Sequence, residues 1–311
     1  MAYFLGIDSG SVSANFALLD EQENLVDSIY LRTNGDPIGA VSEGLKSLEK
    51  YSIERLGVTG SARELIGLLT NADIVKNEIT AHALASAKVM PEVKTVIEIG
   101  GQDSKIIIIR NGVVVDFAMN TVCAAGTGSF LDHQAERLKI PVEDFGSYAL
   151  RAKSEVRIAG RCTVFAESDM IHKQASGASK EEIIKGLCRS LTRNYISNVA
   201  KGKEILSPIV FQGGVAANLG MKKALEEELG CEITIPKNFK VMGAIGAALL
   251  SKESSPDKKG ERRFLLHDRN VSSRAFECND CSNACEVAEL KVDSSSAYLG
   301  GRCGKWEDGN I

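Results

Sequence analysis

Short apolar runs separated by small-residue turns predict β-strands along much of the chain. One such run, its turn and the start of a second run occupy Phe4 to Ser13, and the same layout recurs from Ile97 to Lys105. The second runs continue through Ala14 to Leu19 and Ile106 to Ile109, and each then enters a polar turn and a third apolar segment. The repeated hairpin predicts that the chain contains two similar halves.

Helical periods lie between and after these strands. Apolar residues recur at helical spacing in Ile38 to Tyr51, Ile79 to Val89 and Ser179 to Val199, whereas Ile209 to Phe211 is typical of a buried strand. Helices that alternate with strands place the chain in the α/β class. The pattern dissolves after Leu250, where a charged stretch with Ser-Ser-Pro indicates a linker before a small tail that carries cysteines.

Composition narrows the functions that are open to the chain. With 311 residues and 44% hydrophobic content, it is long enough to bury the cores of about two domains. The formal charge of -4 and the lack of a dense Lys/Arg run argue against binding to nucleic acid or to an anionic membrane surface. We therefore expect neither as a partner.

The chain has no segment that resembles a signal peptide or a membrane span, so we expect a cytoplasmic protein. The longest apolar run, Val241 to Leu250, is too short to cross a bilayer. In a reducing compartment, 8 cysteines indicate metal or redox chemistry, or burial, rather than structural disulfides. The 4 histidines have no paired spacing, and we expect them at the surface or at helix boundaries rather than on a metal.

The two hairpin turns carry the residue types of a phosphate site. Backbone N–H groups and hydroxyls bind phosphate oxygens, and a carboxylate at each turn holds Mg2+ directly or through water. Asp8 and Asp103 are the candidate carboxylates, both for Mg2+ binding and for catalysis. The other candidate contacts are Ser9, Gly10, Ser11 and Ser13 in the first turn and Gly100, Gly101, Ser104 and Lys105 in the second.

Two neighbours of Asp103 each have alternative roles. Gln102 either orients the attacking water and so joins the catalytic set, as a neutral amide does in some GTPases, or makes hydrogen bonds within its loop. Lys105 lies on the return strand, where it either contacts a phosphate or is solvated.

A glycine pair after the strand at Ile209 to Phe211 predicts an adenosine pocket. Because glycine lacks a side chain, a flat base can approach the backbone there. The candidate residues are Gln212, Gly213, Gly214, Ala216 and Asn218.

Together with a Gly/Ala-rich helix at Gly243 to Ala248, these elements resemble, in their order, the superfamily of actin, sugar kinases and heat-shock chaperone ATPases. The resemblance implies an α/β fold with two actin-like (ribonuclease H-like) halves around a nucleotide cleft. We expect the first half at residues 1–93, closed by a helix at 240–250, the second half at 94–239, and a linker with a cysteine-rich tail at 251–311. The motifs of P-loop and Rossmann proteins are absent from the sequence.

Cys123 and Cys162 both precede helix-like segments, where the partial positive charge of a helix N-terminus favours thiolate and a bound anion. Two thiolates are too few for a four-ligand cluster, but a two-fold homodimer would supply four. On spacing alone, two buried cysteines of small apolar character remain an equal alternative. Cys188 and Cys231 are expected to pack in the core.

The stretches from Gly6 to Ser13, Gly100 to Lys105, Asn120 to Phe130, Arg161 to Ser168 and Gln212 to Asn218 are similar to those of one family. The family is that of the 2-hydroxyacyl-CoA dehydratase activators, which is related to the ATPase subunits of benzoyl-CoA reductases. The resemblance implies a homodimer with one bridging [4Fe-4S] cluster, held at the positions that match Cys123 and Cys162. It also implies that ATP drives one low-potential electron from reduced ferredoxin or flavodoxin to an iron-sulfur dehydratase or reductase.

Two other functions fit the same fold. A small-molecule kinase would use Asp103 as general base to a substrate hydroxyl, but it leaves Cys123 and Cys162 without a role. An actin-like assembly protein would bind nucleotide only to switch polymerisation.

The tail departs from the short activators. Cys278, Cys281, Cys285 and Cys303 have spacing that suits a closed site for Zn2+ or for a second iron-sulfur cluster. Because so few residues bury little core, a metal would be a natural source of order, although a tail with unligated thiols is also open.

Overall fold

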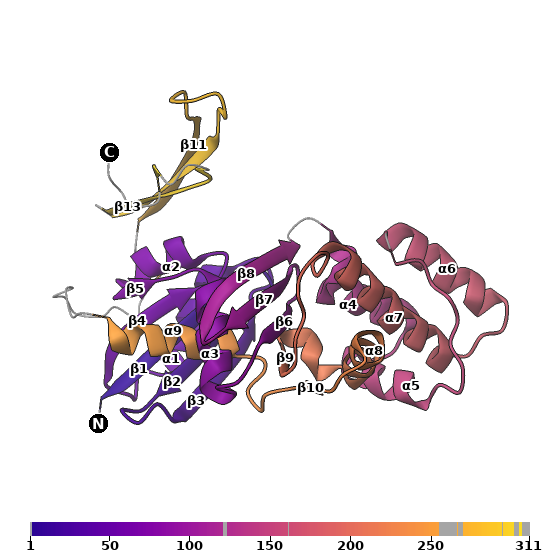
Figure 1. Cartoon of the computed structure of the whole chain (residues 1–311). Coiled ribbons are helices and arrows are strands. Elements are labelled where there is room, and N and C mark those ends of the chain that lie inside the picture. The colour runs from indigo at the N-terminus through magenta and orange to yellow at the C-terminus, as the bar shows by residue number, and fades with distance from the viewer. Residues whose placement is uncertain are drawn as a thin grey trace. The chain divides into compact units, whose positions relative to one another are not determined.

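The computed structural model describes residues 2–120, 123–160, 162–254, 266, 270–293, 295–301 and 305–306. The chain divides into two compact units (Figure 1). Unit 1 comprises Met1–Ala81 with Gly243–Ile311, and unit 2 comprises His82–Met242. Among the described residues, no helix has both the length and the apolar character needed to cross a bilayer.

Unit 1 is built on a five-stranded sheet in the order β3-β2-β1-β4-β5. The strand β1 pairs antiparallel with β2 and parallel with β4, so the predicted hairpin lies beside a crossover strand. Its elements are β1 (Tyr3–Ser9), β2 (Ser13–Leu19), β3 (Leu25–Arg32), α1 (Pro37–Ser47), β4 (Ile53–Thr59), α2 (Arg63–Thr70), β5 (Ile74–Val75) and, from Gly243 on, α9 (Met242–Glu253).

Local sequence signals set the helices of unit 1. The Asp36 side chain accepts a hydrogen bond from the Gly39 backbone N–H at 2.8 Å, and Pro37 is pre-organised for the first turn of α1. The predicted Gly/Ala-rich helix is α9, which packs directly on the sheet. A Cβ on Gly6 would lie 1.8 Å from the Ala244 carbonyl oxygen, so the close approach of α9 requires a glycine there.

Unit 2 repeats the strand order of unit 1. Its sheet reads β8-β7-β6-β9-β10, with β6 antiparallel to β7 and parallel to β9. The elements from the unit boundary on are α3 (Glu78–Val89), β6 (Thr95–Ile99), β7 (Ser104–Arg110), β8 (Val113–Asn120), η1 (Ala124–Gly126), α4 (Gly128–Leu138), η2 (Val142–Asp144), α5 (Phe145–Arg151), α6 (Thr163–Ala175), α7 (Lys180–Asn198), β9 (Ile209–Gln212), η3 (Gly214–Ala217), α8 (Leu219–Leu229) and β10 (Ile233–Thr234).

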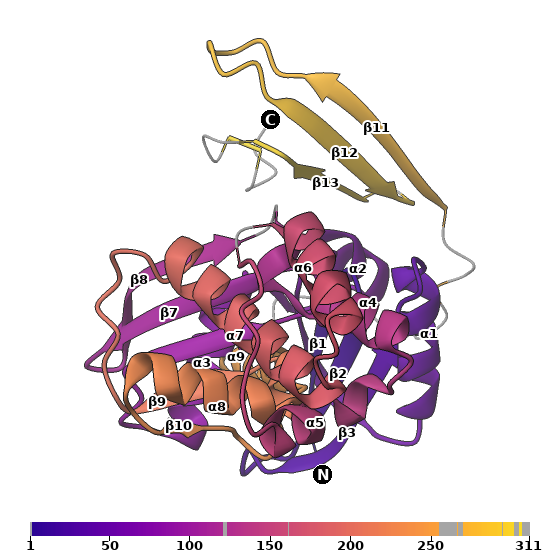
Figure 2. The same ribbon diagram turned by 90° about the vertical axis from the view of Figure 1, so that its right-hand side faces the viewer.

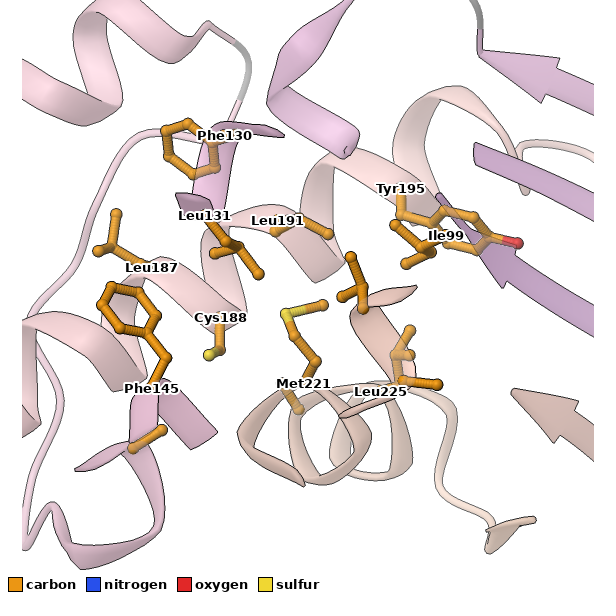
Figure 3. Packing of buried hydrophobic residues seen from close by; sticks show 14 of the residues in the cluster. Ile99, Phe130, Leu131, Phe145, Leu187, Cys188, Leu191, Tyr195, Met221 and Leu225 are labelled. Carbon is orange, nitrogen blue, oxygen red and sulfur yellow. The ribbon is translucent and has the colours of Figure 1, made fainter. Parts of the chain in front are cut away.

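Helix α7 is the centre of the helical layer in unit 2, where it packs against α5, α6 and α8 (Figure 2). It begins with a capping box, in which Ser179 accepts from the Glu182 N–H while the Glu182 carboxylate accepts from the Ser179 N–H. Its apolar face then enters the core along the predicted helical spacing. Side chains of this core, seen in Figure 3, include Phe130, Phe145, Leu187, Cys188, Leu191, Tyr195 and Met221.

The tail forms a three-stranded antiparallel sheet in the order β11-β12-β13. Its strands are β11 (Val271–Glu277), β12 (Glu286–Val292) and β13 (Ser295–Leu299). Backbone hydrogen bonds between these strands therefore order the described part of the tail. The sequence had suggested a bound metal as the source of that order. Most of the expected linker lies outside the described residues.

Candidate functional site

The first hairpin places Asp8 on the strand β1 rather than in the turn. The Gly10 N–H donates to the Ser13 carbonyl at 2.9 Å and closes the turn. In the sheet, Asp8 stands opposite Asn15 on one side and Thr59 on the other. Directly paired residues project from the same face, so the three polar side chains form a row, here called the first row.

Several oxygens at this hairpin are buried without a hydrogen-bond partner among the described residues. They are Ser9 Oγ, Asn15 Oδ1 and Thr59 Oγ1. Such atoms in a folded protein call for an explanation, and a ligand is one. A carboxylate with neighbouring amide and hydroxyl oxygens is the donor set that Mg2+ and its water ligands prefer, so these residues fit a magnesium-nucleotide site.

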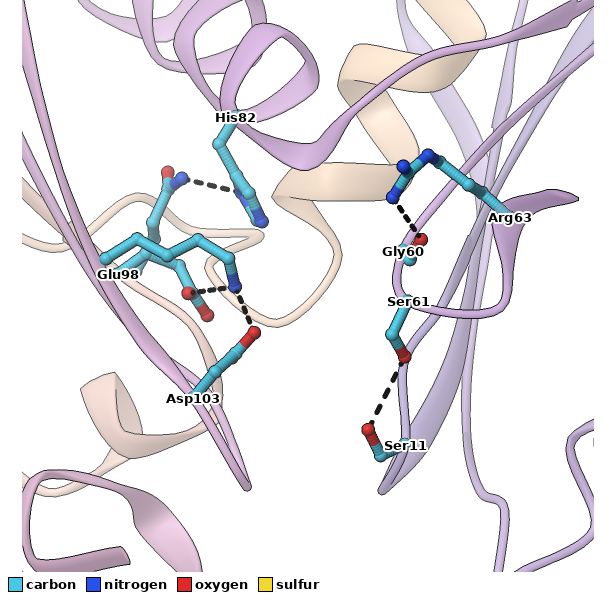
Figure 4. A network of polar contacts seen from close by, with 9 residues as sticks. Ser11, Gly60, Ser61, Arg63, His82, Glu98 and Asp103 are labelled. Carbon is cyan, nitrogen blue, oxygen red and sulfur yellow. Dashed lines mark hydrogen bonds and ion pairs between the residues drawn. The ribbon is translucent and has the colours of Figure 1, made fainter. Parts of the chain in front are cut away.

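The turn after β4 lies against the same hairpin. Ser11 and Ser61 are 3.4 Å apart through their hydroxyls, and Arg63 Nη1 donates to the Gly60 carbonyl at 3.3 Å (Figure 4). Gly60 has φ +100, and a Cβ there would lie 2.3 Å from the Ser9 carbonyl oxygen. The position therefore requires glycine.

The second hairpin has the same closure but a different row. The Gly100 N–H donates to the Asp103 carbonyl at 3.0 Å. Glu98 stands opposite Lys105 on one side and Gln212 on the other, which defines the second row. The Lys105 ammonium lies 3.0 Å from Glu98 Oε2 and 2.8 Å from Asp103 Oδ2 (Figure 4).

Lys105 is 2% exposed, so the alternative in which it is solvated is wrong. Its ammonium is held by two carboxylates within unit 2 because a buried charge needs a counter-charge. Gln102 is exposed and Asp103 is half-buried at the turn, whereas Ser104 is buried and its hydroxyl makes no hydrogen bond to the described part of the chain.

The strand registers show that Asp8 and Asp103, the candidate carboxylates of the two hairpins, do not occupy equivalent positions. The counterpart of Asp8 is Glu98, not Asp103, because each precedes by two residues the glycine whose N–H closes the turn. Asp103 occupies the place of Ser13. The signal was available in the spacing of Asp8 to Gly10 and of Glu98 to Gly100, which an alignment by strand register would have used.

The candidate adenosine segment begins at Gln212, whose side chain is buried and tied to α3. Its Oε1 accepts from Ser86 Oγ at 3.0 Å, and its Nε2 lies 2.9 Å from His82 Nδ1. His82 is 5% exposed and within α3, so the expected surface or helix-boundary position is wrong for this histidine. No local pattern indicates the contact, because His82 and Gln212 are 130 residues apart.

The glycine pair and Asn218 have separate structural roles. Gly213 has φ +88, and a Cβ there would lie 2.5 Å from Glu98 Oε1. Gly214 has open space around its Cα, and Ala216 is buried. Asn218 is the N-cap of α8, where its side chain accepts from the Met221 N–H at 3.1 Å.

Cys123 is held by its backbone. Asn120 Nδ2 donates to the Cys123 carbonyl at 2.7 Å, and Asn120 Oδ1 accepts from the Cys123 N–H at 3.0 Å. Cys123 caps the three-residue η1, and the longer helix α4 begins only at Gly128. The expected helix N-terminus therefore lies further along the chain than Cys123.

The start of α4 is anchored on the second hairpin. The Gly128 N–H donates to the Gly100 carbonyl and the Ser129 N–H donates to the Gly101 carbonyl, both at 2.8 Å. Ser129 Oγ donates to the Gly101 carbonyl at 2.6 Å. The cysteine segment and the turn of the second hairpin are thus joined by three hydrogen bonds.

Cys162 lies at the N-cap of α6, as expected, and its carbonyl accepts from the Ala166 N–H at 3.0 Å. The Cys123 and Cys162 side chains are half-buried, whereas Cys188 is buried. Burial raises the pKa of the Cys188 thiol to about 12, which leaves it inert. The expected packing of Cys188 is confirmed, and Cys231 packs partly buried against the same core.

The tail cysteines occupy the turn between β11 and β12. The Cys278 N–H donates to the Cys285 carbonyl at 2.8 Å, and Cys281 is exposed. Cys303 lies outside the described residues. Within the part of the chain that the structure describes, no three His, Cys, Asp or Glu side chains gather as a metal site.

Known proteins are similar to this chain over more than half of its length. The (R)-2-hydroxyglutaryl-CoA dehydratase activating ATPase of Acidaminococcus fermentans is 38% identical over 253 residues, which are 79% of this chain and 96% of that protein. One of the subunits of the benzoyl-CoA reductase of Thauera aromatica is 30% identical over 180 residues, which are 55% of this chain and 63% of that protein.

Structural comparison agrees with these relatives. The activator of the 2-hydroxyisocaproyl-CoA dehydratase from Clostridium difficile, solved with bound ADPNP, matches with a TM-score of 0.75 and 33% identity. The match covers 84% of this chain and 100% of that one, and it confirms the expected actin-like ATPase fold. Residues 5–251 match the BadF/BadG/BcrA/BcrD ATPase family. The chain is therefore an ATPase and belongs to the BadF/BadG/BcrA/BcrD ATPase family, as its resemblance to the dehydratase activators had predicted.

Proposed function

We propose that this ATPase drives one low-potential electron from a [4Fe-4S] cluster, shared by two copies of the chain, to an iron-sulfur partner. The partner is an enzyme of the 2-hydroxyacyl-CoA dehydratase or benzoyl-CoA reductase type. The observation that carries the proposal is the anchoring of α4 on Gly100 and Gly101, because it links the phosphate turn to the cysteine segment within one unit.

ATP is bound with Mg2+ by residues of both hairpins. Asp8 holds Mg2+ directly or through water, and Asp103 contributes a second carboxylate. The turn residues Ser9, Gly10, Ser11, Ser13, Gly100, Gly101 and Ser104 supply N–H groups and hydroxyls to the phosphates. Gln102, exposed at the turn, is placed to orient the attacking water.

The adenosine is bound at the segment from Gln212 to Asn218. Gly214 leaves its backbone open to a flat base, because no atom lies within 4 Å of a Cβ there, whereas Gly213 provides the positive φ of the turn and Ala216 is buried. Gln212 makes hydrogen bonds within the protein at both ends of its amide, so it shapes this pocket rather than contacts the base. Asn218 uses its Oδ1 to cap α8, but its Nδ2 is buried without a hydrogen bond to the described residues and remains a donor for the ligand.

Cys123 and Cys162 hold the cluster together with the same pair from a second copy. The chemistry of the donors fits, since four thiolates bind a [4Fe-4S] cluster and each chain offers two half-buried thiols. Val164 and Phe165, next to Cys162, are 66% and 67% exposed, which favours an apolar contact with that copy. When bound, the cluster supplies the one-electron chemistry, with reduced ferredoxin or flavodoxin as its donor.

Nucleotide state reaches the cysteines through contacts that differ between two arrangements of the chain. A ligand shifts such an equilibrium only by binding the two arrangements with different affinity. Hydrolysis changes the phosphates at the second turn, and the hydrogen bonds to Gly128 and Ser129 carry that change to α4.

The test is iron content and electron transfer after anaerobic purification. Cys123→Ala and Cys162→Ala are each expected to lose cluster iron, whereas Cys231→Ala, a half-buried cysteine elsewhere in unit 2, keeps it. The wild type should be a dimer that reduces an iron-sulfur dehydratase only while ATP is hydrolysed. A monomer with full iron, or equal reduction without ATP, contradicts the proposal.

The four tail cysteines are proposed to bind a separate Zn2+ or iron-sulfur cluster, and this site stands apart from the electron-transfer function. The full-length Cys281→Ser variant should lose one zinc or about four irons per chain relative to wild type. Equal metal content in both proteins removes the tail site.

A further inference from the structure

Helix α7 holds the segment before Cys162 with three polar side chains. Arg193 Nη2 donates to the Ile158 carbonyl at 2.7 Å, and Ser190 Oγ donates to the Ala159 carbonyl. Asn194 Nδ2 donates to the Gly160 carbonyl at 2.6 Å. Three successive carbonyls just ahead of Cys162 are therefore fixed to one helix.

The other end of the Asn194 amide points to the Cys123 segment. A Cβ on Gly126 would lie 2.8 Å from Asn194 Oδ1 and 3.2 Å from Asn120 Nδ2. Asn120 is the residue whose amide holds the Cys123 backbone. Asn194 thus lies between the two cysteine segments and touches both.

The Gly126 position also lies close to the second hairpin. The Ser104 hydroxyl would lie 3.7 Å from the Gly126 Cβ, and Ser104 pairs with Asn120 across the β7 and β8 ladder. The neighbouring Tyr195 hydroxyl donates to the Lys105 carbonyl at 2.9 Å, which ties α7 to the start of β7. One turn of α7 therefore contacts the phosphate hairpin and both cysteine segments.

Two of these buried groups are complementary and unsatisfied within the described structure. Asn194 is 2% exposed, and its Oδ1 has no hydrogen-bond partner there, nor has the buried Ser104 Oγ. One is an acceptor and the other can donate. Both atoms lie within 4 Å of the point where a Cβ on Gly126 would stand, so a rearrangement of the hairpin can join them. Burial makes the difference between the joined and the separate states energetically significant.

We infer that Asn194 is a positioning residue that couples the second phosphate hairpin, through Ser104, to the Cys123 and Cys162 segments. The inference rests on the proposed function and names the side chain that transmits the nucleotide state to both thiols. The Asn194 amide donates to the Gly160 carbonyl and not to a carboxylate of the proposed Mg2+ site. Removal of the Asn194 side chain should therefore leave nucleotide binding in place.

The experiment measures the reactivity of each thiol in the full-length chain that carries no iron-sulfur cluster. Iodoacetamide alkylation of Cys123 and Cys162 is followed by peptide mass spectrometry with Mg-ADP or Mg-ADPNP present. Buried Cys188 should stay unmodified as long as the chain remains folded, so its alkylation reports unfolding. In the wild type, the two nucleotides should give rates that differ by about fivefold or more at both cysteines, as expected for allosteric coupling. Asn194→Ala should bring that ratio close to one at both.

Thr192→Ala is the matched control, because Thr192 lies on the same helix, is 1% exposed and also has a side-chain oxygen without a hydrogen bond to the described residues. It should keep the wild-type ratio. Gly126→Ala is a second variant that displaces the Asn194 amide by adding a methyl rather than by removing a side chain, and it should also lower the ratio. This keeps the test decisive if Asn194→Ala does not fold.

Equal ratios in wild type, Asn194→Ala and Gly126→Ala would overturn the inference, as would an equal loss in Thr192→Ala. ATP hydrolysis and iron content of the wild type are measured in parallel. If those are present while the thiol rates ignore the nucleotide, the coupling fails and the proposed function stands. If they are absent, the proposed function fails by itself.

Discussion

The two hairpins have the same strand pairing, each in its own sheet, but the polar side chains of the two rows are satisfied differently. In the first row, Asp8 lies between Asn15 and Thr59, whose side-chain oxygens are buried without hydrogen bonds to the described residues. In the second row, Glu98 lies between Lys105 and Gln212, which are both bonded within unit 2.

The repeated backbone had suggested that the two hairpins do the same thing, but the difference between their rows assigns structural support to one and cation binding to the other. A row whose oxygens are satisfied by the protein is suited to hold a turn and its neighbours in place. A row in which the Asn15 and Thr59 oxygens have no hydrogen bond to the described residues is suited to a hydrated cation. We therefore expect mutations in the second row to act first on stability and mutations in the first row to act first on catalysis.

The largest expected effect is that of Lys105→Met. The change leaves Glu98 buried beside Asp103 without the ammonium, and breaking a buried pair in this way costs about 3–5 kcal/mol of unfolding free energy. Urea unfolding followed by circular dichroism measures it. The counterpart Asn15→Ala should cost clearly less, and equal losses in the two variants would break the comparison.

A double variant sharpens this result. Adding Glu98→Gln to Lys105→Met removes the uncompensated carboxylate, so much of the lost stability should return. If the double variant is no more stable than Lys105→Met, the ion pair is not the source of the effect.

Asp8→Asn should act on catalysis instead. If Asp8 positions Mg2+ as proposed, its loss removes several kcal/mol of transition-state stabilisation, so Mg2+-dependent phosphate release should fall by roughly 10²-fold or more. The unfolding free energy should change little because the substitution is isosteric. Asp8→Ala should lower hydrolysis similarly, and Asp103→Asn is also expected to lower it.

The control for Asp8→Asn is Asp36→Asn in the same unit. Asp36 caps α1, and asparagine caps a helix about as well as aspartate does. Hydrolysis should therefore be unchanged in the control. Wild-type hydrolysis in Asp8→Asn, with the fold intact, would reverse the roles given to the two rows.

The smallest effects on stability are expected from Gln212 and Thr59, the members of the two rows that lie on the parallel strands. Gln212→Leu leaves Ser86 and His82 without their partner and should cost about 1–3 kcal/mol of unfolding free energy. Thr59→Val removes a hydroxyl that makes no hydrogen bond to the described part of the chain, so its cost should be near zero. The same denaturation series compares them, and a greater loss in Thr59→Val would contradict the assignment.

Local patterns were enough to predict the two hairpins, the strand β9 and the helices α1, α3 and α7, but not β4, α2 or the strands of the tail. The period of α7 and the hairpin spacing depend on residues close in sequence, and both are present in the structure. The family match likewise followed from short motifs that each fold locally.

The contacts that give each site residue its role were not predictable in this way. Glu98 was overlooked because its partner Lys105 is recognised only through strand register, and the burial of Lys105 depends on the sheet around it. The bond of Gln212 to His82 joins residues on β9 and α3. The anchoring of α4 on Gly100 joins a helix to a turn, with no residue pattern to mark it.

The anchoring of α4 also has a consequence for spectroscopy. The amide protons of Gly128 and Ser129 are donated to the carbonyls of the second hairpin turn rather than to an earlier turn of a helix. Their protection from exchange with deuterium therefore depends on the seating of that turn and not on helix stability alone. During turnover, the exchange rates of these two amides would record how often the turn leaves its place.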